Sequence, residues 1–480
     1  MSQQTPHVVI VPSPGIGHLV PFIEFAKHLV QHHKFRVTCI IPTVGSPSDA
    51  DRAALSSLPP TINHVFLPPI VVSFDDHSTT ESSENTNPLI FAVTRSLPPL
   101  RDVLKSLMST THVVAFVADL FSTVSFDVAF EFNLSPYLFF PSNAMALSFV
   151  FYLPKLDEMV SCEFKDLPVP VQIPGCVPVH GRDLLEPVQN RQSEVYRWFF
   201  DITKRHVGLA KGIIVNTFMD MEAGALKALL EEPGKPPVYP IGPLTRMGSS
   251  DPDDVSGSNC LTWLDDQPSR SVLFVSFGSG GTLSRAQLNE LAFGLEMSQQ
   301  RFIWVVRTPN DESSSAAYLR DQISDQKNPL DFLPEGFLER TKDRGITIPR
   351  WGQQVQILSH GSTGGFLTHC GWNSVLESVV NGVPLLAWPL YSEQKMNAVM
   401  LVKDLKVALM RPKPNEEDGL VIREEIAKVV KELMEGEEGK RVRKPVKDLM
   451  NAASKSLMED GSSIKALSKL TLEWKKQTAI

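Results

Sequence analysis

Cysteine is scarce in this chain, and its few cysteines stand apart from one another. Of 480 residues only five are cysteine, at positions 39, 162, 176, 260 and 370. They form no CxxC pair and no spacing typical of a metal site, and their odd number argues against a disulfide framework. The N-terminus also lacks the basic and then long apolar stretch of a signal peptide. We therefore expect a reduced, cytoplasmic protein.

The chain also lacks an excess of positive charge and a clear membrane-spanning segment. The net charge is -8 and no strongly basic block is present, which argues against a nucleic-acid partner. The longest uncharged stretch, residues 132–154, could cross a membrane by length alone. It contains Pro136, Pro141 and Asn143, which would interrupt a spanning helix. We predict instead a buried strand ("PYLFF") followed by a core helix, and no transmembrane segment.

The common nucleotide-binding fingerprints are incomplete. "SVLFVSFGSGGTLS" (271–284) leads an apolar strand into glycines, but no Lys-Ser/Thr pair follows them and the third dinucleotide glycine is missing. In "PGIGHLV", Val20 stands where that pattern needs glycine. These gaps argue against a nicotinamide enzyme. For residues 278–281, a plain tight turn and a cradle for a phosphate remain equally open.

Short apolar runs alternate with helical patterns along the whole chain. The first 45 residues read as strand, helix and strand: "HVVIVP", then apolar residues at helical spacing from Leu19 to Val30, then "FRVTCIIP". Later runs such as "HVVAFVAD", "SVLFVSFGS" and "GGFLTH" are rich in Val, Ile, Leu and Phe. Such runs are typical of parallel strands buried on both faces, so we predict an α/β protein.

A segment rich in proline, glycine, serine and aspartate, near residues 232–262, divides the chain into two halves. We predict an N-terminal α/β domain over residues 1–240 and a second α/β domain from residue 241 onward. Because open α/β sheets bind ligands at the carboxyl ends of their strands, we expect a site in a cleft that the two domains face.

Polar residues gather at one predicted helix start, in "THCGWNSVLES" from Thr368 to Ser378. The first backbone N–H groups of a helix have no partner within the helix, and the helix dipole adds positive charge there. His369, Asn373 and Ser374 add further hydrogen-bonding groups at the same place. This pattern predicts a site for an anion.

The segment that contains this helix start resembles the signature box of plant family 1 glycosyltransferases, which use UDP-sugars. It reads "WGQQVQILSHGSTGGFLTHCGWNSVLESVVNGVPLLAWPLYSEQ" and spans residues 351–394. Other stretches resemble the same family, among them "VPSPGIGHLVPFIEFAKHL", "IIVNTF", "PPVYPIGPL", "CLTWLDDQP" and "LPEGFLERT". The likeness is strongest to the phenol-glucosylating branch, of the hydroquinone (arbutin-forming) and monolignol type. It implies a GT-B fold of two Rossmann-like domains, over residues 1–240 and 241–460, and a C-terminal helix over 461–480 that packs back on the N-terminal domain.

The resemblance assigns a donor site for UDP-glucose. It implies that Trp351 stacks on uracil and that the carboxylate of Glu377 accepts both ribose hydroxyls. Without the resemblance, a packing aromatic and a solvated helix residue would be the simpler interpretations. The implied nucleoside contacts include Gly352 and Gln354. The implied diphosphate and sugar contacts are Gly17, Ser279, His369, Gly371, Trp372, Asn373, Ser374, Tyr391, Ser392, Glu393 and Gln394.

His18 is the proposed catalyst, with Asp119 as its partner. His18 opens the first predicted helix and could take a proton near neutral pH, and the resemblance supplies Asp119 at the end of a strand. The implied reaction is direct displacement, so an α-linked donor gives a β-glucoside. Because a helix N-terminus would hold the departing UDP, we expect no metal and no cofactor beyond the co-substrate.

The acceptor is predicted to be a small planar aromatic alcohol such as a phenol, hydroquinone, monolignol or indoxyl. Rings expected near it are Phe121, Phe139, Phe140, Phe149 and Trp198, and Glu84 or Glu81 is the expected acidic contact. Two departures from the family pattern affect this site. Gln353 replaces a usual proline, and Val124 replaces a usual acid. A flavonoid glucosyltransferase and a non-catalytic nucleotide-sugar binder remain the alternatives, and we expect a monomer.

Overall fold

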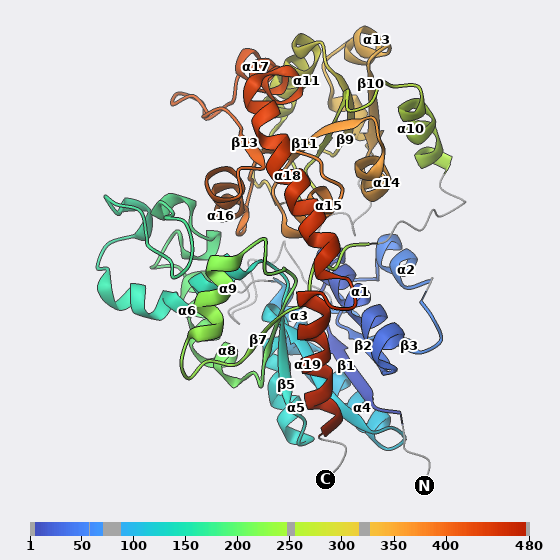
Figure 1. Cartoon of the computed structure of the whole chain (residues 1–480), viewed down its shortest axis with the longest axis vertical. Helices are drawn as coiled ribbons and strands as arrows, with labels where there is room; N and C mark the ends of the chain where they lie inside the picture. The colour runs from blue at the N-terminus through green and yellow to red at the C-terminus, as the bar shows by residue number, and fades with distance from the viewer. Residues whose placement is uncertain (1–4, 57, 71–87, 247–254, 316–326, 477–480) are drawn as a thin grey trace, which may run out of the picture. The chain divides into compact units, whose positions relative to one another are not determined.

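The computed structural model describes residues 5–56, 58–70, 88–246, 255–315 and 327–476 (Figure 1). The chain forms two compact units. Unit 1 contains Met1–Thr245 together with Lys455–Ile480, and unit 2 contains Arg246–Ser454. The C-terminal segment therefore returns to the unit in which the chain begins.

Unit 1 is built on a seven-stranded parallel sheet with the order β3-β2-β1-β4-β5-β6-β7. Every residue of the central strands β1, β4 and β5 is buried, as expected of strands covered on both faces. The strands are β1 (His7–Val11), β2 (Arg36–Ile41), β3 (Ile62–Phe66), β4 (Val113–Asp119), β5 (Pro136–Phe140), β6 (Ile213–Val215) and β7 (Val238–Pro240).

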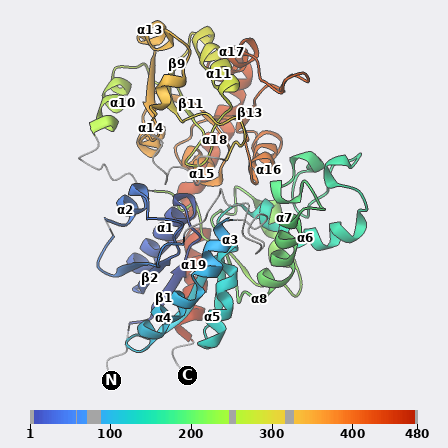
Figure 2. The ribbon, with the colours of Figure 1, turned by 180° about the vertical axis from the view of Figure 1, so that it is seen from behind.

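Helices cover both faces of this sheet. In Figure 1 α19 crosses the face turned toward the viewer, and in Figure 2 α4 and α5 cover the opposite face. The helices are α1 (Ile16–His33), α2 (Asp49–Ser56), α3 (Pro88–Arg95), α4 (Leu97–Met108), α5 (Phe126–Glu131), α6 (Ala144–Met159), α7 (Glu194–Asp201), α8 (Val207–Leu209), α9 (Ala223–Glu231) and α19 (Ser462–Lys476). Short 3₁₀ helices are η1 (Leu120–Ser125), η2 (Phe164–Asp166), η3 (Gly181–Asp183) and η4 (Glu186–Val188), and η5 (Ile202–His206) is a short π-helix.

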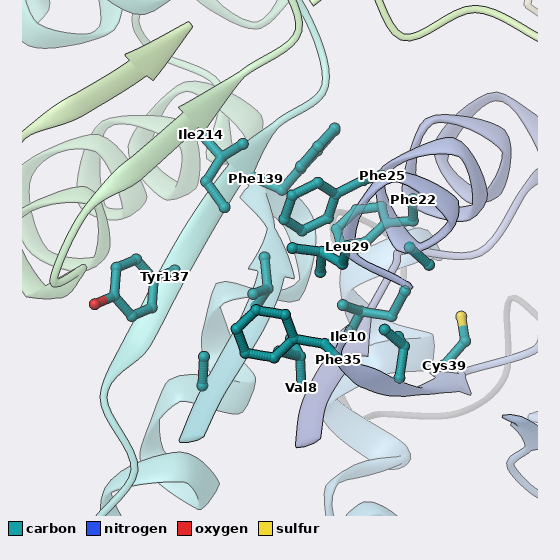
Figure 3. Close-up of a cluster of buried hydrophobic side chains, with 14 of the residues drawn as sticks. Val8, Ile10, Phe22, Phe25, Leu29, Phe35, Cys39, Tyr137, Phe139 and Ile214 are labelled. Carbon is teal, nitrogen blue, oxygen red and sulfur yellow. The ribbon is translucent and has the colours of Figure 1, made fainter. Parts of the chain in front are cut away.

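The core of unit 1 joins α1 and α19 to one face of the sheet. Trp474 of α19 is fully buried, and its ring lies 5.3 Å from that of Tyr137 and 6.4 Å from that of Phe25. Figure 3 shows Phe139 of β5 directed toward Phe22 and Phe25 of α1. Burying rings of this size contributes roughly 1.5–3 kcal/mol each, so α19 is an integral part of the unit 1 core.

The uncharged stretch 132–154 forms β5 and most of α6, as predicted. Nine residues of α6 are buried, which explains why a globular helix is so apolar. None of the helices in the described part of the chain is long and apolar enough to span a membrane.

Unit 2 has a six-stranded parallel sheet with the order β10-β9-β8-β11-β12-β13. Its strands are β8 (Val272–Ser276), β9 (Arg301–Val306), β10 (Gly345–Pro349), β11 (Thr363–Thr368), β12 (Leu385–Ala387) and β13 (Ala408–Met410). Its helices are α10 (Val255–Asp265), α11 (Arg285–Ser298), α13 (Phe337–Thr341), α14 (Gln354–Ser359), α15 (Trp372–Val380), α16 (Gln394–Val399), α17 (Arg423–Glu435) and α18 (Glu437–Ser456), with turns η6 (Pro329–Phe332) and η7 (Met400–Asp404).

The two sheets share one winding scheme. In each, the first three strands run outward in the order 3-2-1, and the fourth strand returns to the other side of the first. The carboxyl ends of the first and fourth strands therefore form the point where the order reverses, which is where such folds bind ligands. These ends are β1 and β4 in unit 1, and β8 and β11 in unit 2. The predicted α/β class with Rossmann-like units is confirmed.

Candidate active site

In unit 1, a histidine and an aspartate meet where the order of the strands reverses. The loop after β1 turns through Gly15, whose φ is 112°, and α1 begins at Ile16. His18 lies in the first turn of α1, and its Nδ1 is 2.8 Å from Oδ2 of Asp119, the last residue of β4. The His18 side chain is 14% exposed and the Asp119 side chain is fully buried. The structure thus brings together two residues that are far apart in the sequence.

The Asp119 carboxylate is held by hydrogen bonds from two segments. The backbone N–H groups of Phe121 and Ser122 each donate to Oδ1 at 3.1 Å. The backbone N–H of Ser13 donates to Oδ2 at 2.9 Å, and the Ser13 hydroxyl donates to Oδ1. These donors replace the water that a buried charge loses, and they fix the direction of the carboxylate. Sequence reasoning missed Ser13, whose only signal was its place in "PSPG".

This geometry sets the role of each ring nitrogen of His18. A carboxylate oxygen accepts hydrogen bonds, so the tautomer that carries its proton on Nδ1 fits the 2.8 Å contact with Asp119 Oδ2. In the neutral ring Nε2 is then the acceptor. A partly exposed imidazole oriented in this way can remove a proton from a hydroxyl group, and the carboxylate can stabilise the imidazolium that forms.

Two aromatic rings lie in a row beside His18, first Phe121 and then Trp198. The Phe121 ring lies edge-on to His18, with centroids 5.5 Å apart, and the Trp198 ring stacks on Phe121 at 6.0 Å and 13°. Both rings are half-buried, so part of their surface is open to a ligand. The backbone of Phe121 is itself fixed by Asp119, which ties this aromatic pair to the dyad.

Three other rings that were expected at the acceptor belong to the core instead. Phe139 and Phe149 are fully buried and Phe140 is 3% exposed. Phe139 packs against Phe22 of α1, with centroids 4.6 Å apart (Figure 3). These rings have almost no surface for a ligand, which corrects the expectation that they line the acceptor site.

Three other predicted site residues in this half of the chain can be placed only in part. Glu81 and Glu84 lie outside the described residues. Gly17 lies in the first turn of α1 and has open space where a side chain would project.

In unit 2, the loop between β11 and α15 has the features of an anion site. β11 ends at Thr368, and α15 begins at Trp372 with Gly371 as its N-cap. Because glycine has no side chain, it cannot bond to the first amides of the helix as Ser or Asp would. Asn373 is half-buried and Ser374 is buried in this first turn. The helix start expected from the sequence is therefore present with its polar residues in place.

His369 fits between Gly371 of this loop and Gly278 of the loop that follows β8. A Cβ added at Gly278 would lie 2.5 Å from the His369 ring, and one at Gly371 would lie 2.3 Å from Nε2. Both distances are shorter than any real contact, so glycine at each position makes room for the ring. Burial lowers the pKa of His369 to about 4, which leaves the imidazole neutral at pH 7. His369 can therefore donate one hydrogen bond to an anion without adding charge. Ser279, half-buried, follows Gly278 in the same turn.

An exposed ring precedes α14, and a buried acid lies in α15. Trp351 is 46% exposed, which is unusual for so large an apolar side chain and leaves a flat face uncovered. Gln354 donates to Ser374 Oγ at 2.8 Å and to Glu377 Oε2 at 2.6 Å. Glu377 is only 8% exposed, and burial raises its pKa. It is thus no solvated helix residue. At Gly352, a Cβ would lie 2.9 Å from the Val305 side chain.

The end of the signature segment is also ordered by its own side chains. Gln394 Oε1 accepts hydrogen bonds from the backbone N–H groups of Leu390 and Tyr391, at 2.9 and 3.1 Å. Because both partners are donors, the oxygen must face them, and the Gln394 amide NH₂ is turned away. Ser392 has a left-handed φ of 59°, which shapes this turn before Glu393. Trp372 is only 3% exposed, so it shapes the start of α15 and offers little ring surface to a sugar.

Together these features define a class of enzyme. Unit 1 carries a partly exposed histidine in contact with a buried carboxylate, beside aromatic rings. Unit 2 carries a helix N-terminus that no side chain caps, together with an exposed tryptophan and a buried carboxylate. The pattern is that of a transferase that uses a nucleotide-sugar donor.

Comparisons with known proteins give the family. Residues 250–438 match the family described as UDP-glucoronosyl and UDP-glucosyl transferase. The chain is 58% identical to the hydroquinone glucosyltransferase of Rauvolfia serpentina, over 98% of both chains. A Polygonum tinctorium UDP-glucosyltransferase capable of glucosylating indoxyl, solved with 3,4-dichloroaniline, is 51% identical. That match has a TM-score of 0.88 and covers 99% of this chain and 100% of the other.

A third match is the Phytolacca americana UGT2 structure, solved with UDP-2fluoro-glucose and pterostilbene. It is 49% identical with a TM-score of 0.87, over 98% of this chain and 100% of the other. The chain therefore belongs to the plant family 1 UDP-glycosyltransferases of the GT-B fold, in the phenol-glucosylating branch. It is a UDP-glucose-dependent O-glucosyltransferase, and the family and the activity expected from the sequence are confirmed.

Proposed function

We propose that the protein transfers glucose from UDP-glucose to the hydroxyl group of a small planar aromatic acceptor and inverts the configuration at the anomeric carbon. The observation that carries the proposal is the 2.8 Å contact between His18 Nδ1 and Asp119 Oδ2 beside the Phe121 and Trp198 rings. The relatives add support, since their names include hydroquinone and indoxyl as acceptors.

The reaction begins with proton removal by His18. Nε2 takes the proton of the acceptor hydroxyl, while Asp119 keeps the ring oriented and stabilises the imidazolium. A phenolic hydroxyl has a pKa near the ~10 of tyrosine, so a histidine can assist its ionisation. The phenolate oxygen attacks the anomeric carbon from the face opposite UDP. The C–O bond to UDP breaks, and an α-linked donor becomes a β-glucoside.

The departing UDP is an anion that unit 2 is suited to hold. The first amides and the dipole of α15, together with His369, Ser374 and Ser279, would stabilise the diphosphate as its charge develops. Trp351 would stack on uracil, and Glu377 would accept the ribose hydroxyls. Since protein groups supply this stabilisation, we propose that turnover needs no metal and survives a strong chelator.

The acceptor is proposed to be small and flat because the open ring surface beside His18 is limited. Phe121 and Trp198 provide it, whereas Phe139, Phe140 and Phe149 are committed to the core. Val124 follows in the same turn, η1, and it is half-buried where an acid is usual. An apolar group there favours a ring that carries less polar substitution than hydroquinone, such as a fused bicycle of the indoxyl type.

We further propose a cytoplasmic, monomeric enzyme. All five cysteines are free thiols, and three of them are buried. Thiols persist in a reducing compartment, which supports the cytoplasm as its location.

Kinetics with a panel of acceptors tests the proposal. UDP release would be measured with UDP-glucose and hydroquinone, coniferyl alcohol, indoxyl, a flavonol or a steroid alcohol. We expect the small phenolic acceptors to give the largest kcat/KM. A preference of more than about tenfold for the flavonol or the steroid, which corresponds to ~1.4 kcal/mol, would contradict the acceptor class. No UDP release with any acceptor would indicate a non-catalytic nucleotide-sugar binder.

A further inference from the structure

A fully buried asparagine in unit 2 contacts two parts of the donor site. Asn397 lies in α16, three positions beyond the last residue of the signature segment, and its side chain is completely buried. Its Nδ2 donates to the carbonyl oxygen of Cys370 at 2.9 Å and lies 3.4 Å from Glu393 Oε1. Cys370 stands between His369 and Gly371, and Glu393 directly precedes Gln394. The side-chain amide of Asn397 therefore connects the loop between β11 and α15 with the loop before α16, which is expected to bind the sugar.

The backbone that Asn397 holds is strained. Cys370 has a φ of 67°, in the left-handed region that a residue with a side chain adopts only at a cost. This turn ends β11, and the chain enters α15 two residues later. Both peptide groups of Cys370 are bonded to side chains, since its N–H donates to Thr368 Oγ1 at 3.2 Å. Such a conformation persists when its surroundings fix it, and Asn397 supplies half of that support.

We propose that Asn397 is a positioning residue of the donor site. It touches neither UDP nor sugar in this scheme. It holds the left-handed turn at Cys370 that places His369 and the start of α15, and it sets Glu393 at a fixed distance from them. This inference rests on the donor site proposed above.

The chemistry of the two contacts explains the residue type. The Cys370 carbonyl and the Glu393 carboxylate are both acceptors, so the group between them must supply two donors. An asparagine amide does so, whereas the similarly shaped aspartate would place an acceptor against two acceptors. Asn397→Asp is therefore the most informative substitution, because it reverses the polarity of the contact and leaves the volume unchanged.

A second side-chain contact, to the backbone of β11, provides a matched control. Arg443 of α18 donates to the carbonyl oxygen of Gly364 at 2.9 Å, near the beginning of β11. It also donates to the carbonyls of Leu433 and Met434, at 3.3 and 3.2 Å. Asn397 binds the chain just after this strand ends and Arg443 binds it near its start. Arg443→Met should destabilise unit 2 without moving the donor loops.

The test compares Asn397→Asp, Asn397→Ala and Arg443→Met with the wild type. Calorimetry measures the affinity for UDP and for UDP-glucose, steady-state kinetics gives the donor and acceptor KM, and thermal unfolding gives the stability. We expect the Asn397 variants to bind UDP-glucose at least about tenfold more weakly, as for loss of a buried hydrogen bond, and to raise the donor KM. UDP alone should lose less, because Glu393 is not expected to contact it. The acceptor KM should stay within about twofold, and Arg443→Met should lower the melting temperature with unchanged affinity.

A rescue variant keeps the inference testable if Asn397→Asp does not fold. Glycine adopts a φ near 67° without strain, so Cys370→Gly combined with Asn397→Ala should recover part of the UDP affinity that Asn397→Ala loses. Wild-type affinity in the Asn397 variants, or an equal loss in Arg443→Met, would overturn the role of Asn397. Absence of rescue in the double variant would overturn the role of the turn. A wild-type protein that does not bind UDP-glucose would instead overturn the proposed donor site.

Discussion

The same place in the two sheets is used in opposite ways. In unit 1, the fourth strand ends in Asp119, whose carboxylate bonds to the amides of Phe121 and Ser122 at the start of the next turn. In unit 2, the fourth strand leads to Gly371, which has no side chain to occupy the start of α15. In unit 1, the amides that follow the fourth strand thus bind the protein's own carboxylate. In unit 2, the N-cap residue has no side chain to occupy the corresponding amides, so they can bind a ligand.

The loops after the first strands differ in the same sense. In unit 1 this loop brings Ser13 and His18 to the carboxylate of Asp119, so an internal charge orients a base. In unit 2 it brings Gly278 against the ring of His369, where the absence of a side chain makes room. A common topology can therefore support the two proposed tasks, proton removal in unit 1 and anion binding in unit 2, because different residues follow the ends of the strands.

Removing the base should separate these tasks with the largest effect. We expect His18→Ala to lower kcat by on the order of 10²–10⁴-fold, the usual contribution of a general base, and to leave UDP affinity unchanged. Steady-state kinetics and calorimetry with UDP measure the two quantities. His32→Ala, an exposed histidine on the same helix α1, is the matched control and should behave as the wild type. Wild-type turnover in His18→Ala would refute the mechanism.

Removing the exposed ring of unit 2 should give the reverse pattern. We expect Trp351→Ala to lose roughly 1–3 kcal/mol of UDP binding, the range for a base stacked on an aromatic ring. Turnover at saturating UDP-glucose should change much less. Trp351→Phe keeps an aromatic face and should retain part of the affinity. If Trp351→Ala binds UDP as tightly as the wild type, the nucleoside lies elsewhere.

The sequence predicted the residues that carry a recognisable pattern and missed those whose role depends on a distant partner. Alternating apolar runs were sufficient for the α/β class, and the signature segment identified Gln354, Ser374 and Glu377, which the structure brings into contact. Ser13 was missed because its partner, Asp119, lies on another strand. Asn397 was missed because it lies beyond the segment and binds a backbone carbonyl, which leaves no trace in side-chain composition.

The aromatic acceptor residues show a different limit. Phe121 and Phe149 both occur in apolar surroundings of the sequence, yet one ring is half-buried beside His18 and the other is fully buried. Whether a ring in an apolar run faces the core or a ligand depends on the register and direction of its element. Periodicity alone does not give this where nearly every position is buried, as in the first part of α6.

A third substitution tests how unit 2 recognises the sugar. The backbone of Leu390 and Tyr391 fixes Gln394 with its NH₂ turned away from them, so it should donate to sugar hydroxyls. The wild type should prefer UDP-glucose to UDP-galactose, since the wrong epimer would leave a polar group unpaired. Gln394→Glu can keep both loop hydrogen bonds but loses the donor, and we expect about a tenfold lower kcat/KM for UDP-glucose. Competition between the two donors measures the preference, and a wild-type preference for galactose would contradict this assignment.

The last prediction concerns stability, and it compares one buried histidine from each unit under acid. His7 lies at the amino end of β1, with Nε2 2.8 Å from Thr38 Oγ1, and His369 lies between β11 and α15, in the proposed donor site. Burial lowers the pKa of both to about 4, and for His7 the nearby charge of Arg36 adds to this. Since an unfolded histidine has a pKa near 6.5, the unfolded chain binds more protons between pH 6.5 and 4. The stability that each neutral histidine contributes is therefore complete above pH 6.5 and is lost as the pH falls toward 4.

For His7, the shift corresponds to on the order of 2 kcal/mol of stability lost between pH 7 and pH 5. We expect thermal unfolding of the wild type to begin a few degrees lower at pH 5, and His7→Gln, which can keep the bond to Thr38 without titrating, to show a smaller decrease. His369→Gln should also reduce the acid sensitivity, but it alone should weaken UDP binding at pH 7, because only His369 lies at the carboxyl ends of its strands. Equal acid sensitivity in His7→Gln and the wild type would show that His7 takes up its proton in the folded state as readily as in the unfolded chain.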